Sequence, residues 1–79
     1  MAIEYMYQVK QFTIRIVNKN NRWRIYIHNG TDEDYYLSSP SKESAIDTLN
    51  SHTTDCFEWD IAYGLEVPES IHEWHIVPH

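Results

Sequence analysis

Basic residues, which can hold an anionic ligand, are concentrated near the start of this chain. Five of the six lie between Lys10 and Arg24, whereas eleven of the twelve acidic residues lie between Asp32 and Glu73. Residues 1–24 thus hold five basic residues against one acid, a formal charge of +4, and residues 25–79 hold one against eleven, a charge of −10. When charges of one sign are gathered on one surface, they attract an oppositely charged partner to that surface and orient it. The separation of basic from acidic residues along the sequence therefore predicts a binding surface.

The basic residues lie on a predicted β-hairpin. Two runs of alternating apolar and polar residues, 12–17 and 22–28, flank the polar residues 18–21, which is typical of a hairpin with a four-residue loop. Pairing Val17 with Arg22 across that loop sets Arg15 directly opposite Arg24. The candidate binding residues on this outer face are Arg15, Arg22, Arg24 and Tyr26.

The outer face of the hairpin has three interpretations. Arginine and tyrosine side by side suit phosphate contact and base stacking, so the face could bind nucleic acid. A net charge of −6 argues against that ligand, because affinity for nucleic acid comes largely from positive charge. The face could instead bind a protein, or be a solvated surface neutralised by Glu58 and Asp60 on a neighbouring strand.

The acidic residues form the second candidate surface. An acidic display can cover a basic groove on another protein, although it also keeps a small domain soluble. The run from Asp32 to Asp34 lacks the spaced ligand loop of a calcium site. The candidate partner-binding residues of the acidic face are Asp32, Glu33, Asp34, Glu58, Asp60 and Glu73.

Metal binding and catalysis find little support in the residue types and their spacing. His72 and His75 would point to opposite faces of a strand, so they would not share a zinc ion. His52 and Cys56 straddle a predicted helix end, and His79 lies at the last position. The chain has no glycine-rich phosphate loop and no nucleophile elbow, and Cys56 is interpreted as a small apolar residue. We expect no metal, no cofactor and no enzymatic activity.

The elements that position these residues predict an α+β fold. A β-rich run from 7 to 17, the strand 22–28 and a short strand 35–37 precede a helix that begins at Ser39 and ends near Asn50 or Ser51. Alternation returns in 57–63 and 72–77, which predicts two more strands. The predicted chain order is β-β-β-α-β-β, a single antiparallel sheet with one helix packed on one face.

The predicted core lies between that helix and the sheet. The helix would bury Ala45, Ile46 and Leu49 against it, because these residues recur at helical spacing. The three tryptophans, Trp23, Trp59 and Trp74, fall on the apolar side of their predicted strands, so we expect all three to be largely buried on the helix-facing side.

Length and composition predict one small cytoplasmic domain. Seventy-nine residues suffice for a single domain, and eleven aromatic residues help to build its core. A single cysteine excludes an internal disulfide and indicates a reducing compartment. No apolar run approaches the roughly 18 residues that span a bilayer, so no membrane partner is expected. The two open edges of the predicted sheet would permit a homodimer.

The function predicted from these features is binding of another protein. Small acidic proteins without catalytic residues are common among phage-encoded inhibitors of host enzymes, such as anti-CRISPR and anti-restriction proteins, and among immunity or adaptor proteins. We therefore expect a non-enzymatic protein that binds and inhibits or modulates another protein. The alternative is a nucleic-acid-binding module that uses the basic outer face of the hairpin.

Overall fold

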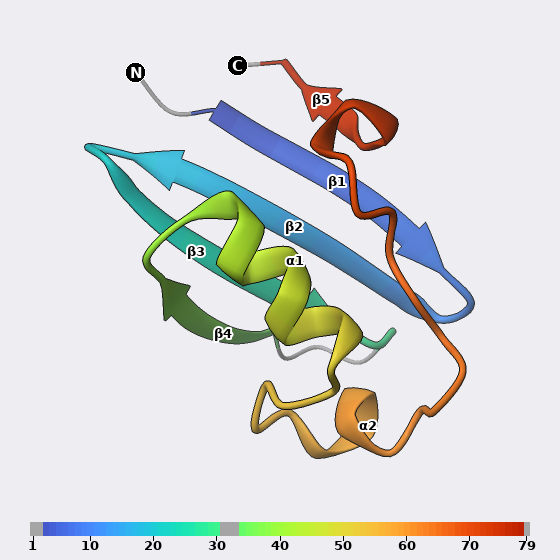
Figure 1. Ribbon diagram of the computed structural model, residues 1–79. Coiled ribbons are helices and arrows are strands. Elements are labelled where there is room, and N and C mark those ends of the chain that lie inside the picture. Colours follow the sequence, from blue (N-terminus) through green and yellow to red (C-terminus); the bar gives the residue numbers. More distant parts are fainter. Residues whose placement is uncertain (1–2, 31–33, 79) are drawn as a thin grey trace.

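The computed structural model describes residues 3–30 and 34–78 as one five-stranded antiparallel sheet with short helices on one side (Figure 1). The α+β class is confirmed, but four strands precede the main helix rather than three. The strand order across the sheet is β4-β3-β2-β1-β5. The elements, in chain order, are β1 (Ile3–Val9), β2 (Phe12–Lys19), β3 (Arg22–His28), β4 (Asp34–Ser39), α1 (Lys42–Asn50), α2 (Phe57–Asp60), the 3-10 helix η1 (Ile71–Glu73) and β5 (His75–Val77).

The hairpin of β2 and β3 exists, but its register differs from the predicted one by two residues. Ile16 pairs with Ile25, and Lys19 pairs with Arg22. The loop therefore shrinks to Asn20 and Asn21, whose φ angles of 55° and 62° are left-handed. Asparagine tolerates this backbone, and two successive left-handed residues match the twist of a two-residue hairpin. A two-residue shift keeps every side chain on its predicted face, because the side-chain period of a strand is two.

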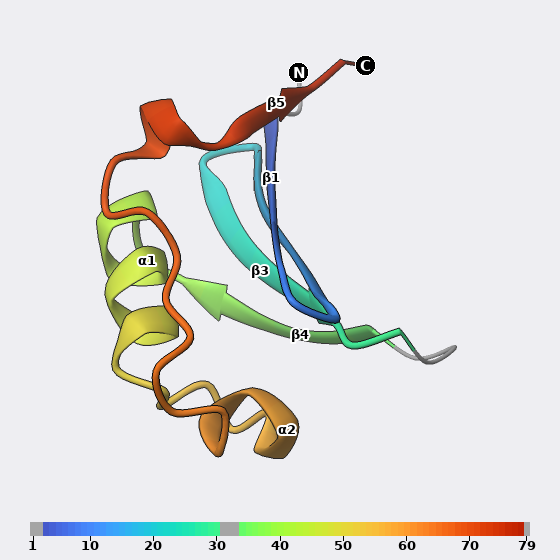
Figure 2. The same cartoon turned by 90° about the vertical axis from the view of Figure 1, so that its right-hand side faces the viewer.

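The core lies between one face of the sheet and α1. Figure 2 shows the sheet from its edge, with α1, α2 and η1 all on the same side. The inward residues of β2 and β3 are almost completely buried there, as are the three apolar residues predicted for the helix. These buried residues are Phe12, Ile14, Ile16, Ile25, Ile27, Ala45, Ile46 and Leu49.

Helix α1 begins two residues later than predicted. Its N-cap is Ser41, whose hydroxyl accepts a hydrogen bond from the backbone N–H of Ser44 at 3.1 Å. Ser39, the predicted cap, instead donates its hydroxyl to the carbonyl of Ser41 at 3.0 Å. The helix ends at Asn50, as predicted.

The predicted strand 57–63 is wrong, because the chain forms the single helical turn α2 there. Trp59 is completely buried, whereas Phe57, Ile61 and Tyr63 are 69%, 53% and 82% exposed. The alternation of large apolar residues therefore reflects one inward anchor and three outward side chains. One helical turn is too short to show a helical period in the sequence.

The predicted strand 72–77 is correct only at its end. Residues 71–73 form η1, and β5 covers His75–Val77, where Ile76 pairs with Tyr5 of β1. The first and last strands thus lie side by side, which brings the two ends of the described chain together (Figure 1).

Two of the three tryptophans are fully inside the core. Trp59 is 0% and Trp74 is 4% exposed, although neither lies in a strand. Trp23, the second residue of β3, is only half-buried. Their burial therefore agrees with the prediction for two residues and falls short for the third. Within the described residues, no helix has the length and apolar character needed to cross a membrane.

Candidate functional site

The face of the sheet opposite the helices is uncovered in the described structure (Figure 2). Its side chains come from alternate positions of the strands. Arg15 lies opposite Tyr26, Val17 opposite Arg24, and Lys19 opposite Arg22. The predicted pairing of Arg15 with Arg24 is therefore wrong, and the like-charged pair is Lys19 with Arg22. Like charges directly opposite each other destabilise a strand pair.

Arginine and tyrosine side chains alternate across this open face. The Arg15 guanidinium carbon lies 4.7 Å from the centre of the Tyr26 ring, and that of Arg24 lies 5.9 Å from the centre of the Tyr36 ring. The two tyrosine rings are 5.9 Å apart and tilted by 30°. Cations held over ring faces are attracted by the ring quadrupole. Arg15 also lies 3.8 Å from a carboxylate oxygen of Glu4.

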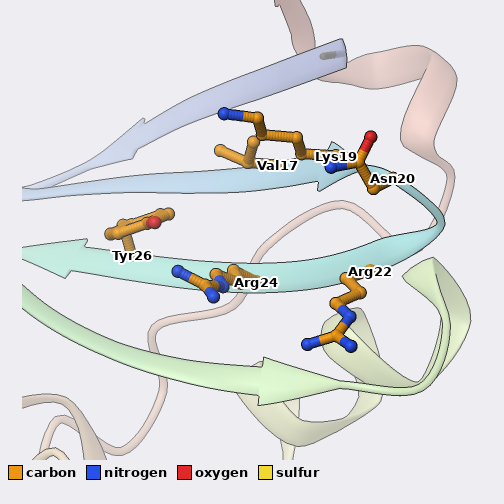
Figure 3. Close-up of a pocket in the computed structure, with 6 residues that line it drawn as sticks. All are labelled: Val17, Lys19, Asn20, Arg22, Arg24 and Tyr26. Carbon is orange, nitrogen blue, oxygen red and sulfur yellow. The ribbon is translucent and has the colours of Figure 1, made fainter. Parts of the chain in front are cut away.

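A basic depression of about 590 Å³ lies on this face beside the β2–β3 turn (Figure 3). It is lined by Val17, Lys19, Asn20, Arg22, Arg24 and Tyr26. None of these lining residues is acidic. Among the side chains that the structure describes, no carboxylate lies within ion-pair distance of Lys19, Arg22 or Arg24. The structure thus brings Arg22, Arg24 and Tyr26 of the predicted basic face together, and it adds Lys19.

Glu58 and Asp60 do not neutralise the arginines, contrary to one interpretation of the sequence. Both belong to α2, which lies on the helical side of the sheet (Figure 2). The Asp60 carboxylate accepts hydrogen bonds from the backbone N–H groups of Thr54 and Asp55, both at 2.9 Å, and from the Thr54 hydroxyl at 2.7 Å. Asp60 therefore holds the loop before α2.

The predicted acidic face is dispersed. Glu58 is on α2 and Glu73 on η1, which lie at opposite ends of the helical side in both views (Figures 1 and 2). Asp34 begins β4, whereas Asp32 and Glu33 lie outside the described residues. The described members of this set therefore do not form one surface.

Exposed apolar residues form a patch at α2, where the alternation of residues 57–63 predicts a strand instead of a helical turn. We call Phe57 and Ile61 the α2 patch. Phe57 and Ile61 are four residues apart, and the backbone N–H of Ile61 donates to the carbonyl of Phe57 at 3.1 Å. This spacing puts both side chains on the same side of the turn. Two exposed acids are close to them in the chain, Asp55 two residues before Phe57 and Glu58 directly after it.

Buried polar contacts hold the α2 patch in place. The indole N–H of Trp59 donates to the carbonyl of Leu49 at 2.8 Å, which satisfies an unpaired carbonyl at the end of α1. The His52 ring stacks on Trp59, with centroids 5.0 Å apart, and its nitrogens lie 2.8 and 2.9 Å from the carbonyls of Trp59 and Leu65. These contacts join α2 to the end of α1 and to the chain that follows α2.

Cys56, interpreted from the sequence as a small apolar residue, belongs to the hydrophobic core. Its side chain is buried at the start of α2, 6% exposed. Burial raises the pKa of the thiol, and the nearby carboxylate of Glu58 raises this pKa further, although a backbone hydrogen bond from Trp59 opposes them. A thiol with a raised pKa is a weak nucleophile at neutral pH, because the thiolate is the reactive form.

The histidines are separated in the structure. His72 is on η1 and His75 is on β5, both exposed, whereas His52 is engaged beside Trp59. His79 lies outside the described residues. Across the described part of the chain, no three histidine, cysteine or acidic side chains are grouped closely enough to hold a metal ion.

Comparisons of the chain with protein-family models, with curated proteins and with solved structures found no match.

Proposed function

We propose that this chain is a non-enzymatic binding protein that docks on another protein through the α2 patch. The observation that carries the proposal is the exposure of Phe57 and Ile61, 69% and 53%, one turn apart on a helix held rigidly by Trp59. Exposed apolar side chains gathered on one element mark interaction sites when polar residues surround them. Aromatic residues in particular are enriched in protein interfaces.

Rigidity favours this surface over a mobile loop. The loop before α2 is fixed by three hydrogen bonds to Asp60, and the chain after it is tied to α1 by Asn50. The Asn50 side chain donates to the carbonyl of Val67 at 3.1 Å and accepts from its N–H at 2.8 Å. A preorganised surface loses little conformational freedom when it binds, which improves affinity.

Charge around the patch indicates the kind of partner. After Ser39 the chain contains eight acidic residues and one basic residue, Lys42. Asp55 and Glu58 are close to the patch in the chain, and both are exposed. An apolar centre with an acidic rim fits an apolar pocket bordered by basic residues on the partner. Occupying such a pocket would inhibit or modulate the partner without chemistry.

The first prediction compares two serine variants of exposed apolar residues. The double variant Phe57→Ser/Ile61→Ser should fold like the wild type, because both side chains are exposed. It should no longer bind the partner protein that the wild type captures from its source cell. Quantitative mass spectrometry of affinity-captured material measures the loss. Ile76→Ser is the matched control, because Ile76 is 70% exposed on β5 at the other end of the molecule.

Binding kinetics with the captured protein then test the acidic rim. Glu58→Lys should slow association more than it speeds dissociation, since rim charges act mainly on encounter. Asp60 is unsuitable for this test, because its replacement would release the loop before α2. Equal capture of the same proteins by the wild type and the double serine variant would overturn the proposed function.

A further inference from the structure

We propose that the open face of the sheet binds single-stranded nucleic acid, with phosphate groups in the basic depression and bases stacked on the tyrosine rings beside it. This face lies on the opposite side of the sheet from α2 (Figure 2). The proposal is therefore independent of the α2 patch and of the protein that it binds.

The depression suits phosphate groups. Lys19 and Arg22 are directly opposite each other, and an anion between two such cations would relieve their repulsion. Arg24 adds a third positive charge from the same strand as Arg22, and Figure 3 shows all three side chains around the depression. Its volume of about 590 Å³ falls within the range of about 300–1,000 Å³ that is typical of ligand sites.

The neighbouring tyrosines suit bases. Tyr36 is 59% exposed on β4 and lies 5.9 Å from Tyr26, which lines the depression. Aromatic rings on a sheet beside a basic groove are the combination by which proteins bind single strands. A duplex keeps the faces of its bases stacked inside, so it could use the cations but not the rings. The arrangement therefore favours a single strand.

The net charge of −6 does not prevent this binding, because the charges are separated in space. The eight acids after Ser39 belong to the segments that cover the other face of the sheet, or to the loops joining them. At about 0.1 M salt, exposed charges more than about 10 Å apart are largely screened from one another. The positive face can therefore act on a ligand locally.

The second prediction is binding of a short fluorescent oligouridylate, measured by anisotropy with the full chain. Affinity should fall as salt rises from about 50 to 200 mM, with a slope of log K against log salt near −2, since three phosphate contacts each contribute about −0.7. Arg24→Glu should abolish binding. Lys42→Glu is the matched control, because it makes the same change of charge on α1. An acid near the start of a helix is favourable, so this variant should fold and bind oligouridylate as the wild type does.

A pair of tyrosine variants separates base stacking from simple charge attraction. Tyr36→Ala should weaken oligouridylate binding about tenfold, because one stacked base is lost. Tyr63→Ala, on the other side of the sheet, should have no effect. Thermal melting checks that each variant remains folded.

Three outcomes would overturn the proposal. The first is no detectable binding at low salt, and the second is equal binding by wild type and Arg24→Glu. The third is equal affinity for oligouridylate and polyglutamate with no effect of Tyr36→Ala, which would show that the face recognises acidic polymers in general, as an interface for an acidic protein would.

Discussion

Trp59 shows how one residue can join the layers of this small protein. Its ring is completely buried, it meets Phe12 of β2 edge to face with centroids 5.1 Å apart, and its N–H donates to the last turn of α1. A single side chain thereby connects the sheet, the main helix and the turn that carries the α2 patch. Aromatic pairs in this geometry contribute about 0.5–1.5 kcal/mol beyond the area they bury.

The third prediction follows from this position of Trp59. Trp59→Ala should be unfolded at room temperature and so show no cooperative thermal transition. The loss of this buried ring lowers the free energy of unfolding by about 3–5 kcal/mol. A single core of this size rarely supplies more than about 3–5 kcal/mol. Circular dichroism against temperature measures the effect, with Tyr63→Ala, whose ring is 82% exposed, as the control. A variant that melts near the wild-type temperature would contradict the assigned role of Trp59.

At the scale of elements, the β2–β3 turn decides which side chains meet on the open face. Its two asparagines have φ angles of 55° and 62°, and the two-residue loop sets Lys19 opposite Arg22. A four-residue loop would have set Arg15 opposite Arg24. Both registers place the same residues on the same faces, so hydrophobic alternation does not distinguish them. The composition of the basic face was predictable, but the neighbours of each cation were not.

The fourth prediction tests the geometry of that turn. Asn21→Val should lower the free energy of unfolding by about 1–2 kcal/mol, because a β-branched residue is strained at a left-handed position. Asn21→Gly should not lower it, because glycine adopts this backbone freely. Urea unfolding of both variants measures the difference. Equal stability of the valine and glycine variants would argue against a left-handed Asn21.

At the scale of the whole molecule, charge and apolar exposure are divided between two sides. The sheet presents arginines, a lysine and tyrosines on its open face, whereas the segments after Ser39 carry eight of the twelve acids and the α2 patch. The fold therefore offers two surfaces of different chemistry. Acids that the sequence grouped into one face are spread over α2, η1 and β4.

The fifth prediction concerns the stability of the whole molecule at alkaline pH. Burial raises the pKa of Cys56 above 9.0 and that of Tyr35 above 10.0, their ordinary values. The folded chain then retains protons that the unfolded chain releases, so these two groups should lower the free energy of unfolding as pH rises above 9.0.

The contribution of the thiol can be isolated by substitution. In Cys56→Ala, the free energy of unfolding should fall less steeply between pH 9.0 and 10.0 than in the wild type. The remaining group, Tyr35, contributes only above pH 10.0. Urea unfolding at a series of pH values gives the curve. A wild-type protein that gains stability over this interval would contradict the assigned burial.

Local patterns in the sequence determined the class of fold, the hairpin and the inward face of α1. They did so because alternation and helical spacing report directly which side of an element is apolar. Tertiary structure decided the rest. Residues 57–63 alternate like a strand, yet Trp59 alone enters the core, because the hydrogen bonds to Asp60 and Leu49 fix a helical turn there. The α2 patch is exposed only because these contacts form, whereas the basic depression depends on the register that the β2–β3 turn sets.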